Sequence, residues 1–345
     1  MVVRVLLVLA ALAVLYGCGQ ASSPAEKQGG VAETEPKAVS DGCLGQYRSL
    51  ANPEYSPDGQ KILFISTYLY PTPASVPGSA SGPTAAPGTD PSEADDEICV
   101  VNADGTGTVN LTSNSDPELV AAWSPDGTKV AFVRYEDYDA AILVMNADGS
   151  NETGLQHAPN VNALSWSPDG QEIAFSTRVS GRSVSSREIR AVRADGSGTP
   201  KKLTSAPVYR AAQNPAWSPD GKWIAFKSDR DNPPHSYANG GDIYVMRIGD
   251  PDQWRQLTYG SANDDHPAWS PDGTEIAFDR TDARGGTPTI YKVNTYDGSN
   301  ETYLAAGSVP TWTPDGKHIA YGGLGGLYKM NSDGSEQTLI VDDRP

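Results

Sequence analysis

Short apolar segments recur along this chain with the alternation of large and small side chains that is typical of β-strands packed on both faces. The first kind of segment occurs six times, at residues 61–64, 129–132, 172–175, 223–226, 275–278 and 318–321. In the last five copies, Ala stands between a β-branched and an aromatic residue. A second kind follows each copy, at residues 98–101, 142–145, 189–192, 243–246, 290–293 and 327–330. The pattern therefore predicts an all-β protein built from many short strands.

A four-residue turn motif precedes each copy of the first segment. Ser-Pro-Asp-Gly occurs five times and Thr-Pro-Asp-Gly once, beginning at Ser56, Ser124, Ser167, Ser218, Ser270 and Thr313. Pro presets φ for the second turn position, Asp is accepted at the third, and Gly takes the left-handed position that re-enters a strand. Each motif therefore predicts a tight hairpin.

The spacing of the motifs gives the size of the repeating unit. From the second motif onward the spacings are 43, 51, 52 and 43 residues, which is the length of one four-stranded propeller blade. The first spacing is 68 residues, because residues 71–95 form a Pro-, Ala-, Ser-, Thr- and Gly-rich insertion that we expect to be disordered. We therefore predict a six-bladed β-propeller of four-stranded antiparallel blades over residues 43–345. A Trp stands directly before five of the turns, and we expect it to pack between blades.

Charge and cysteine content narrow the class of protein further. The chain has 43 acidic and 26 basic residues, a net charge of −17 and a pI near 4.6, which argues against a nucleic-acid partner. Its 3 Cys exclude a disulfide-dense scaffold. We expect a monomer.

The N-terminal residues predict export. Residues 1–17 combine a basic start with a short apolar run, and Leu15-Tyr16-Gly17-Cys18 is similar to a bacterial lipobox. Cys18 is the predicted site of lipidation. The polar, Pro- and Gly-containing residues 18–42 then read as a flexible tether. We therefore expect a protein anchored by lipid to the bacterial cell membrane or outer membrane, facing the periplasm or the exterior.

One repeat carries a specific family resemblance. Read from Pro215 to Thr258, the unit Pro-Ala-Trp-Ser-Pro-Asp-Gly, Ile-Ala-Phe, Ser-Asp-Arg-Asp, Asp-Ile-Tyr-Val-Met and Gln-Leu-Thr resembles the TolB-like β-propeller repeat. The resemblance covers the chain from about residue 51 to residue 345. It implies a six-bladed propeller that binds envelope proteins, such as a peptidoglycan-associated partner in the Tol-Pal system. Only about 30 residues of tether stand where that family carries an N-terminal α/β domain, so we expect a lipoprotein version without it.

Motifs of catalysis are absent from the sequence. It contains no zinc-protease helix motif, nucleophile elbow, phosphate loop or Cys-Xaa-Xaa-Cys pair. We therefore expect a binding scaffold rather than an enzyme. The alternative is a metal-assisted carbohydrate-active enzyme, a lyase or hydrolase, with its site in the channel mouth. That reading needs two of His157, His235 and His266 to approach one shared carboxylate.

Variable loops on a rigid scaffold are the usual place for binding residues. We expect the residues just upstream of the innermost strands to ring the channel mouth and to contact a partner: Asp116, Glu118, Asn162, Asn214, Asp264, Asp265 and His266. A calcium ion held by their oxygens is an alternative to a solvated acidic rim, and no other cofactor is expected. Four arginines that recur after the first segment are expected to donate hydrogen bonds between blades: Arg134, Arg178, Arg230 and Arg280.

Two cysteines remain once Cys18 is assigned to lipidation. Cys43 and Cys99 either stay as free thiols or form a disulfide, which an oxidising compartment permits. A disulfide would tie the start of the domain to the first blade.

Overall fold

A computed structural model of the chain describes residues 43–44, 48–68, 96–112, 114, 116–136, 139–179, 186–204, 211–230 and 240–343. Contacts divide the chain into two units, Met1–Ala38 and Val39–Pro345, and every described residue belongs to the second. The signal peptide of residues 1–17, the Cys18 lipidation site, the tether and the insertion of residues 71–95 lie outside the described residues and stay predictions. None of the described residues forms a helix with the length and hydropathy needed to cross a bilayer.

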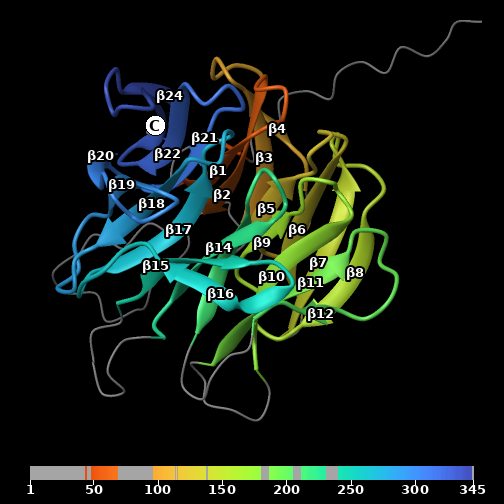
Figure 1. Cartoon of the computed structure of the whole chain (residues 1–345). Helices are drawn as coiled ribbons and strands as arrows, with labels where there is room; N and C mark the ends of the chain where they lie inside the picture. Colours follow the sequence, from red (N-terminus) through yellow and green to blue (C-terminus); the bar gives the residue numbers. More distant parts are fainter. Residues whose placement is uncertain are drawn as a thin grey trace, which may run out of the picture. The chain divides into compact units, whose positions relative to one another are not determined.

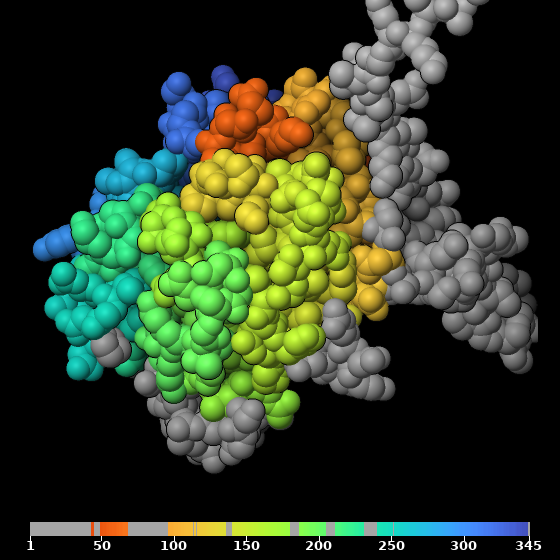
Figure 2. All heavy atoms as spheres, turned by 90° about the vertical axis from the view of Figure 1, so that its right-hand side faces the viewer, coloured from red at the N-terminus to blue at the C-terminus, as the bar shows by residue number. Residues whose placement is uncertain are grey.

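The described chain confirms the all-β, six-bladed propeller. It forms six four-stranded sheets, and every pair of neighbouring strands within a sheet is antiparallel. In Figure 1 the first strands of the sheets gather near the centre, and the fourth strands lie at the periphery. In Figure 2 consecutive segments lie side by side, from orange through yellow and green to cyan, so the blades follow one another in chain order.

Each blade uses four strands that are consecutive in the chain. The innermost strands are β1 (Arg48–Tyr55), β5 (Glu118–Trp123), β9 (Leu164–Trp166), β13 (Ala212–Trp217), β17 (Asn263–Trp269) and β21 (Ser308–Trp312). The second strands are β2 (Lys61–Tyr68), β6 (Lys129–Glu136), β10 (Glu172–Arg178), β14 (Trp223–Ser228), β18 (Glu275–Thr281) and β22 (His318–Gly323). The third strands are β3 (Glu97–Asn102), β7 (Asp139–Asn146), β11 (Arg187–Arg193), β15 (Asp242–Arg247), β19 (Thr289–Asn294) and β23 (Gly326–Asn331). The outer strands are β4 (Val109–Asn110), β8 (Thr153–Ala158), β12 (Lys201–Lys202), β16 (Asp250–Gln256), β20 (Thr302–Ala306) and β24 (Thr338–Asp342).

The turn motif builds the hairpin between the first and second strands, as predicted. The Ser56 hydroxyl donates to Asp58 Oδ1 at 2.6 Å and accepts from the Lys61 N–H at 2.9 Å. The Gly59 N–H donates to the Ser56 carbonyl oxygen at 2.8 Å, and Gly59 has a φ of +70°. Because the other five motifs repeat these bonds, one local sequence sets the same turn in every blade.

The turns also contact one another around the ring. A Cβ placed on Gly127 would lie 3.5 Å from Pro57 Cδ in the preceding blade, and the same Pro–Gly pairing recurs at the other motifs. It joins the two ends of the ring as well, because a Cβ on Gly59 of blade 1 would lie 3.6 Å from Pro314 Cδ of blade 6.

The hydrophobic cores lie between blades, and the Trp residues join the blades as expected. One core cluster mixes Leu63 and Ile98 of blade 1 with Phe132 of blade 2. The Nε1 of Trp166 donates to the Ala122 carbonyl oxygen in the preceding blade at 3.1 Å. The Trp residues of blades 5 and 6 make the same bond, at 3.0 and 3.1 Å.

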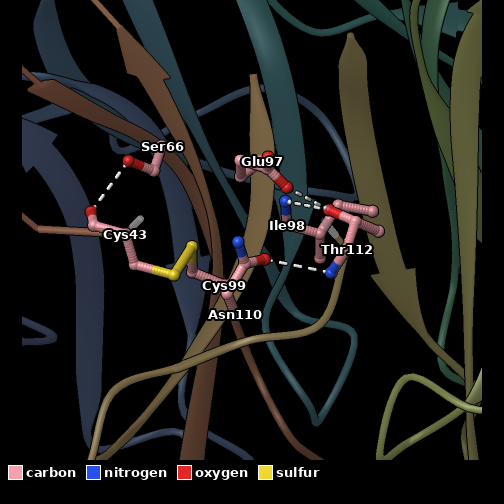
Figure 3. Close-up of a disulfide and its surroundings, with 7 residues drawn as sticks. All are labelled: Cys43, Ser66, Glu97, Ile98, Cys99, Asn110 and Thr112. Carbon is pink, nitrogen blue, oxygen red and sulfur yellow. Dashed lines mark hydrogen bonds between the residues drawn. A yellow bond between two sulfur atoms is a disulfide. The ribbon is translucent and has the colours of Figure 1, made fainter. Parts of the chain in front are cut away.

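Blade 6 meets blade 1 without exchanging a strand, since both sheets contain only their own consecutive strands. A disulfide between Cys43 and Cys99 lies at this seam (Figure 3). Both cysteines are buried in a cluster that also contains Ala320 and Leu327 of blade 6. The Ser66 hydroxyl donates to the Cys43 carbonyl oxygen at 2.8 Å. Side-chain packing therefore holds the seam closed, and the disulfide ties the segment before β1 to β3 on the blade 1 side of it.

Candidate functional site

A channel runs through the ring and is lined by residues of all six innermost strands. Its volume is about 440 Å³. Most of its wall residues are Pro, Ala and Trp, but polar groups make up almost as much of the wall surface as apolar ones. Among the described residues that line it, the ionisable side chains are Glu54, Tyr55 and His266.

A β-bulge with a left-handed residue shapes the wall in four of the six blades. At each bulge the pairing register shifts, and a residue with positive φ precedes a Pro. These residues are Asn52 (φ 53°), Asn214 (φ 50°), His266 (φ 47°) and Val309 (φ 50°). Asn tolerates this left-handed conformation, whereas His and above all the β-branched Val adopt it at a cost in strain. All four residues line the channel.

Charged side chains of blades 4 and 5 meet at the channel mouth. Lys227 Nζ lies 2.7 Å from Asp265 Oδ2, and the Asn214 side-chain amide donates to Asp265 Oδ1. His266 Nδ1 lies 2.8 Å from Asp279 Oδ2. The cluster of Asn214, Lys227, Asp265, His266 and Asp279, called the mouth cluster below, therefore consists of two adjoining ion pairs on neighbouring blades.

The mouth cluster favours a charged His266. Burial lowers the pKa of His266, but its hydrogen bond and attraction to Asp279, together with the charge of Asp265, outweigh burial and raise that pKa above its usual value. For Asp265 the directions are opposite: burial raises its pKa, but the charges of His266 and Lys227 lower that pKa more. Asp279 also accepts the Val309 N–H at 2.8 Å, which holds the strained backbone of blade 6. The His266 side chain keeps 39% of its surface exposed, so a partner can reach it.

A neutral polar group continues the mouth in blades 3 and 4. The Ser176 hydroxyl donates to the Asn162 side-chain oxygen. The Asn162 amide in turn donates to Gln213 Oε1 at 3.4 Å. Polar side chains therefore extend over blades 3 to 5 at this end of the channel.

The structure brings together only part of the predicted site. Asn162, Asn214 and His266 line the channel, and Asp265 bonds to Asn214 beside it. Glu118 and Asp264 do not lie on the rim: both are buried within their blades, with 0% and 1% of their surface exposed. Asp116 is exposed in the loop before β5, where its N–H donates to Asn114 Oδ1 at 2.8 Å, and it does not line the channel.

Glu118 and Asp264 belong instead to two equivalent arginine clamps. Arg134 Nε lies 2.9 Å from Glu118 and its Nη1 lies 2.8 Å from Glu152. Arg280 makes the same pair of contacts in blade 5, with Asp264 at 2.6 Å and Glu301 at 2.7 Å. These two arginines therefore join strands of one blade, whereas the sequence suggested bonds between blades.

Three mouth residues were missed by sequence reasoning. Ser176, Lys227 and Asp279 directly follow the Phe of the second strand. At this position the other blades have Ile65, Val133 and Gly322. The residue type therefore varies between repeats while the preceding residue is always Phe or Tyr, and this variation could have marked the position as part of a site.

The hypothesis of a metal-assisted enzyme is not supported by a set of metal ligands in the part of the chain that the structure describes. There, no three His, Cys, Asp or Glu side chains are placed to hold one metal ion. His157 lies on the outer strand β8 of blade 2 and His266 on the inner strand β17 of blade 5. His235 lies outside the described residues.

The family known as the TolB beta propeller domain matches residues 88–242 and 238–340. A relative, the Tol-Pal system protein TolB of Bordetella pertussis, is 31% identical over 146 residues, which cover 42% of this chain and 32% of that protein. This chain thus spans less than a third of the length of the curated TolB relatives it matches; with two other relatives the shared region covers 15% of their length.

Two solved structures share the fold. TolB from Acinetobacter baumannii has a TM-score of 0.59 and 22% identity, covering 86% of this chain and 64% of that one. Oligogalacturonate lyase from Vibrio parahaemolyticus has a TM-score of 0.53 and 13% identity, covering 86% of this chain and 79% of that one. Because the folds of TolB and of a lyase both match, the function must be argued from the site.

Proposed function

Because this chain belongs to the TolB beta propeller domain family, we propose that it is a non-enzymatic binding scaffold of the bacterial envelope. Its partner is an envelope protein or a cell-wall component, and the binding surface is the channel mouth with the loops around it. The scaffold part of this proposal rests on the family membership and on the likeness to Tol-Pal system relatives.

The mouth cluster is the observation that carries the proposed surface. Its charged groups are held by one another in fixed positions, since Lys227, Asp265, His266 and Asp279 form two ion pairs. A partner therefore meets preorganised groups and loses little free energy in ordering them. The exposed part of the His266 ring can donate to that partner, because Nε2 has no hydrogen-bond partner within the described residues.

The lipobox supports the cellular location. Lipidation of Cys18 would hold the propeller at a membrane surface through a tether of residues 18–42, so the propeller would face the periplasm or the exterior. A lipid-modified N-terminus, detected by mass spectrometry of the membrane fraction and lost in Cys18→Ala, is the expected result.

The enzyme alternative has less support. The observation in its favour is that oligogalacturonate lyase has a similar structure at 13% identity, and this similarity concerns the fold alone. The described residues contain no three His, Cys, Asp or Glu side chains placed to hold one metal ion, and the mouth carboxylates Asp265 and Asp279 are already bonded to Lys227 and His266.

A capture experiment tests the proposed surface. The lipidated full-length chain in detergent captures partners from solubilised envelopes, and the variant combines Asp265→Asn with His266→Asn. Asn removes both charges but accepts the left-handed backbone at position 266, as it does at positions 52 and 214. We expect recovery of the partner to fall at least about tenfold, as for a hot-spot residue.

Asp252→Asn is the matched control, because it removes an exposed charge on the outer strand β16, away from the channel. It should recover the partner as the unmodified protein does. Equal recovery by all three proteins would remove the mouth cluster as the binding surface.

A further inference from the structure

Among the described residues that line the channel, one side chain, Glu54, carries a carboxylate, and it lies deeper than the mouth cluster. Glu54 occupies the position just before the aromatic residue that ends the innermost strand. The other five blades have small side chains at this position: Ala122, Ser165, Ala216, Ala268 and Thr311. All of them line the channel, as Glu54 does. Blade 1 therefore adds one charged group to a wall that is otherwise built from small residues at this level.

No cation of the described chain neutralises Glu54. It makes no salt bridge within the described residues, and its carboxylate accepts a hydrogen bond from the backbone N–H of Trp123. The other ionisable side chains of the channel wall are Tyr55 and His266, and His266 is bonded to Asp279. The channel thus holds an acidic group without a countercharge.

The surroundings of Glu54 penalise a bare negative charge. Burial raises the pKa of Glu54 to about 8, and the Trp123 N–H offsets only part of this. The wall around it offers Pro53, Pro267, Pro310 and the Trp rings, which are apolar. A ligand that brings a positive charge and an apolar body would satisfy both features. The net charge of −17 favours the entry of such a ligand over that of an anion.

We propose that the channel is a binding site for a small organic cation, an aliphatic amine, whose ammonium group pairs with the Glu54 carboxylate while its methylene groups lie along the Pro, Ala and Trp wall. The cavity of about 440 Å³ admits a linear diamine with its water. This site depends on Glu54 of blade 1, whereas the proposed partner surface at the mouth depends on the ion pairs of blades 4 and 5.

Binding by this route must release a proton. At about pH 7 the free protein holds most of Glu54 in its protonated form, because its pKa is about 8. The ammonium group pairs only with the ionised form, so the carboxyl proton passes to the buffer when the amine binds. The number of protons released then depends on the buffer pH and falls above the pKa of Glu54.

Titration calorimetry of the full-length chain with 1,4-diaminobutane tests the site. We expect saturable binding of one diamine per chain and, at about pH 7, a release of close to one proton, measured by comparing phosphate with Tris buffer. Glu54→Gln keeps the shape of the side chain and should weaken binding at least about tenfold, with no proton release. Circular dichroism checks that this variant is folded.

Two controls make the result decisive. The Asp252→Asn variant, which removes an exposed charge away from the channel, should bind the diamine as the unmodified protein does. Butane-1,4-diol, which lacks the charge, should not bind. The proposal is overturned if the unmodified protein gives no saturable heat, or if Glu54→Gln binds the diamine within about twofold of it.

Discussion

A single residue can change the chemistry of a repeated position. Glu54 and Ala268 occupy equivalent places before the turn, and the backbone around both contains the same bulge. In blade 5 this position contributes a methyl group, and in blade 1 it contributes an acid whose pKa is raised to about 8. The repeat thus fixes the position in the channel, and the residue type decides whether a charge stands there.

The raised pKa of Glu54 makes stability depend on pH. The unfolded chain ionises Glu54 near its ordinary pKa of 4.5, while the folded chain keeps the proton up to about pH 8. The folded state binds more protons in this interval, so the free energy of unfolding falls as pH rises from about 4.5 to about 8. Outside this interval, Glu54 contributes no further change of the free energy of unfolding with pH. Glu54→Gln stays neutral and should escape the loss, which amounts to about 1.4 kcal/mol for each unit of pKa difference.

Urea unfolding of both proteins across this pH interval measures the effect. The free energy of unfolding of Glu54→Gln minus that of the unmodified protein should increase steadily with pH. His266 titrates in both proteins, so its own contribution cancels in the difference. A difference that stays constant with pH would show that Glu54 ionises normally in the folded chain.

At the scale of elements, the turn between the third and fourth strands contacts the preceding blade in five of the six blades. A Cβ on Gly105 would lie 2.2 Å from the Ile340 carbonyl oxygen of blade 6, and one on Gly298 would lie 2.2 Å from the Leu257 carbonyl oxygen of blade 4. Blade 4 departs from this pattern in sequence, and a Cβ placed on its Gly249 would meet no atom within 4 Å. The Asp-Gly turns are therefore contacts between blades as well as chain reversals.

These two kinds of glycine allow a matched comparison. Gly105 and Gly249 have φ values of +85° and +80°, so Ala strains the backbone similarly at both. Only Gly105→Ala adds a clash with a neighbouring backbone. We expect Gly249→Ala to cost about 1 kcal/mol and Gly105→Ala clearly more, about 2 to 4 kcal/mol, measured by urea unfolding. Equal costs would mean that the turn does not press on blade 6.

The strands and turns were predictable because the residues that set each hairpin are neighbours in the sequence of one repeat. Ser56, Asp58 and Gly59 bond within one turn, so the hairpin follows from neighbouring residues alone. The site was less predictable, because a one-residue bulge decides which side chains face the channel. Asp264 and Asp265 are adjacent, yet Asp264 turns into its blade toward Arg280 while Asp265 meets Lys227 of blade 4. No local sequence pattern contains these partners.

At the scale of the whole molecule, the ring has one junction unlike the others. Blades 1 and 6 come from the two ends of the propeller sequence and share no strand. The Pro314–Gly59 contact and the buried cluster around Leu50 and Leu327 repeat what other junctions have. The Cys43–Cys99 disulfide is the addition, and it fixes the chain before β1 onto β3. The covalent bond therefore fixes onto blade 1 the Cys43 segment, which packs in one cluster with Ala320 and Leu327 of blade 6.

Removing this disulfide should loosen the seam before the rest of the ring. Cross-linking residues 56 apart stabilises a folded chain by roughly 4 kcal/mol in the chain-entropy description. In the Cys43→Ala, Cys99→Ala variant we expect a lower Tm and faster amide hydrogen exchange in β1, β22 and β23, with β11 and β13 little changed. Ala avoids placing a hydroxyl in this buried cluster, and the unmodified protein treated with a reductant controls for the small cavity that Ala leaves. Exchange that rises equally in all six blades would show that the ring opens as one unit, and that the disulfide acts on the unfolded chain alone and not on the seam.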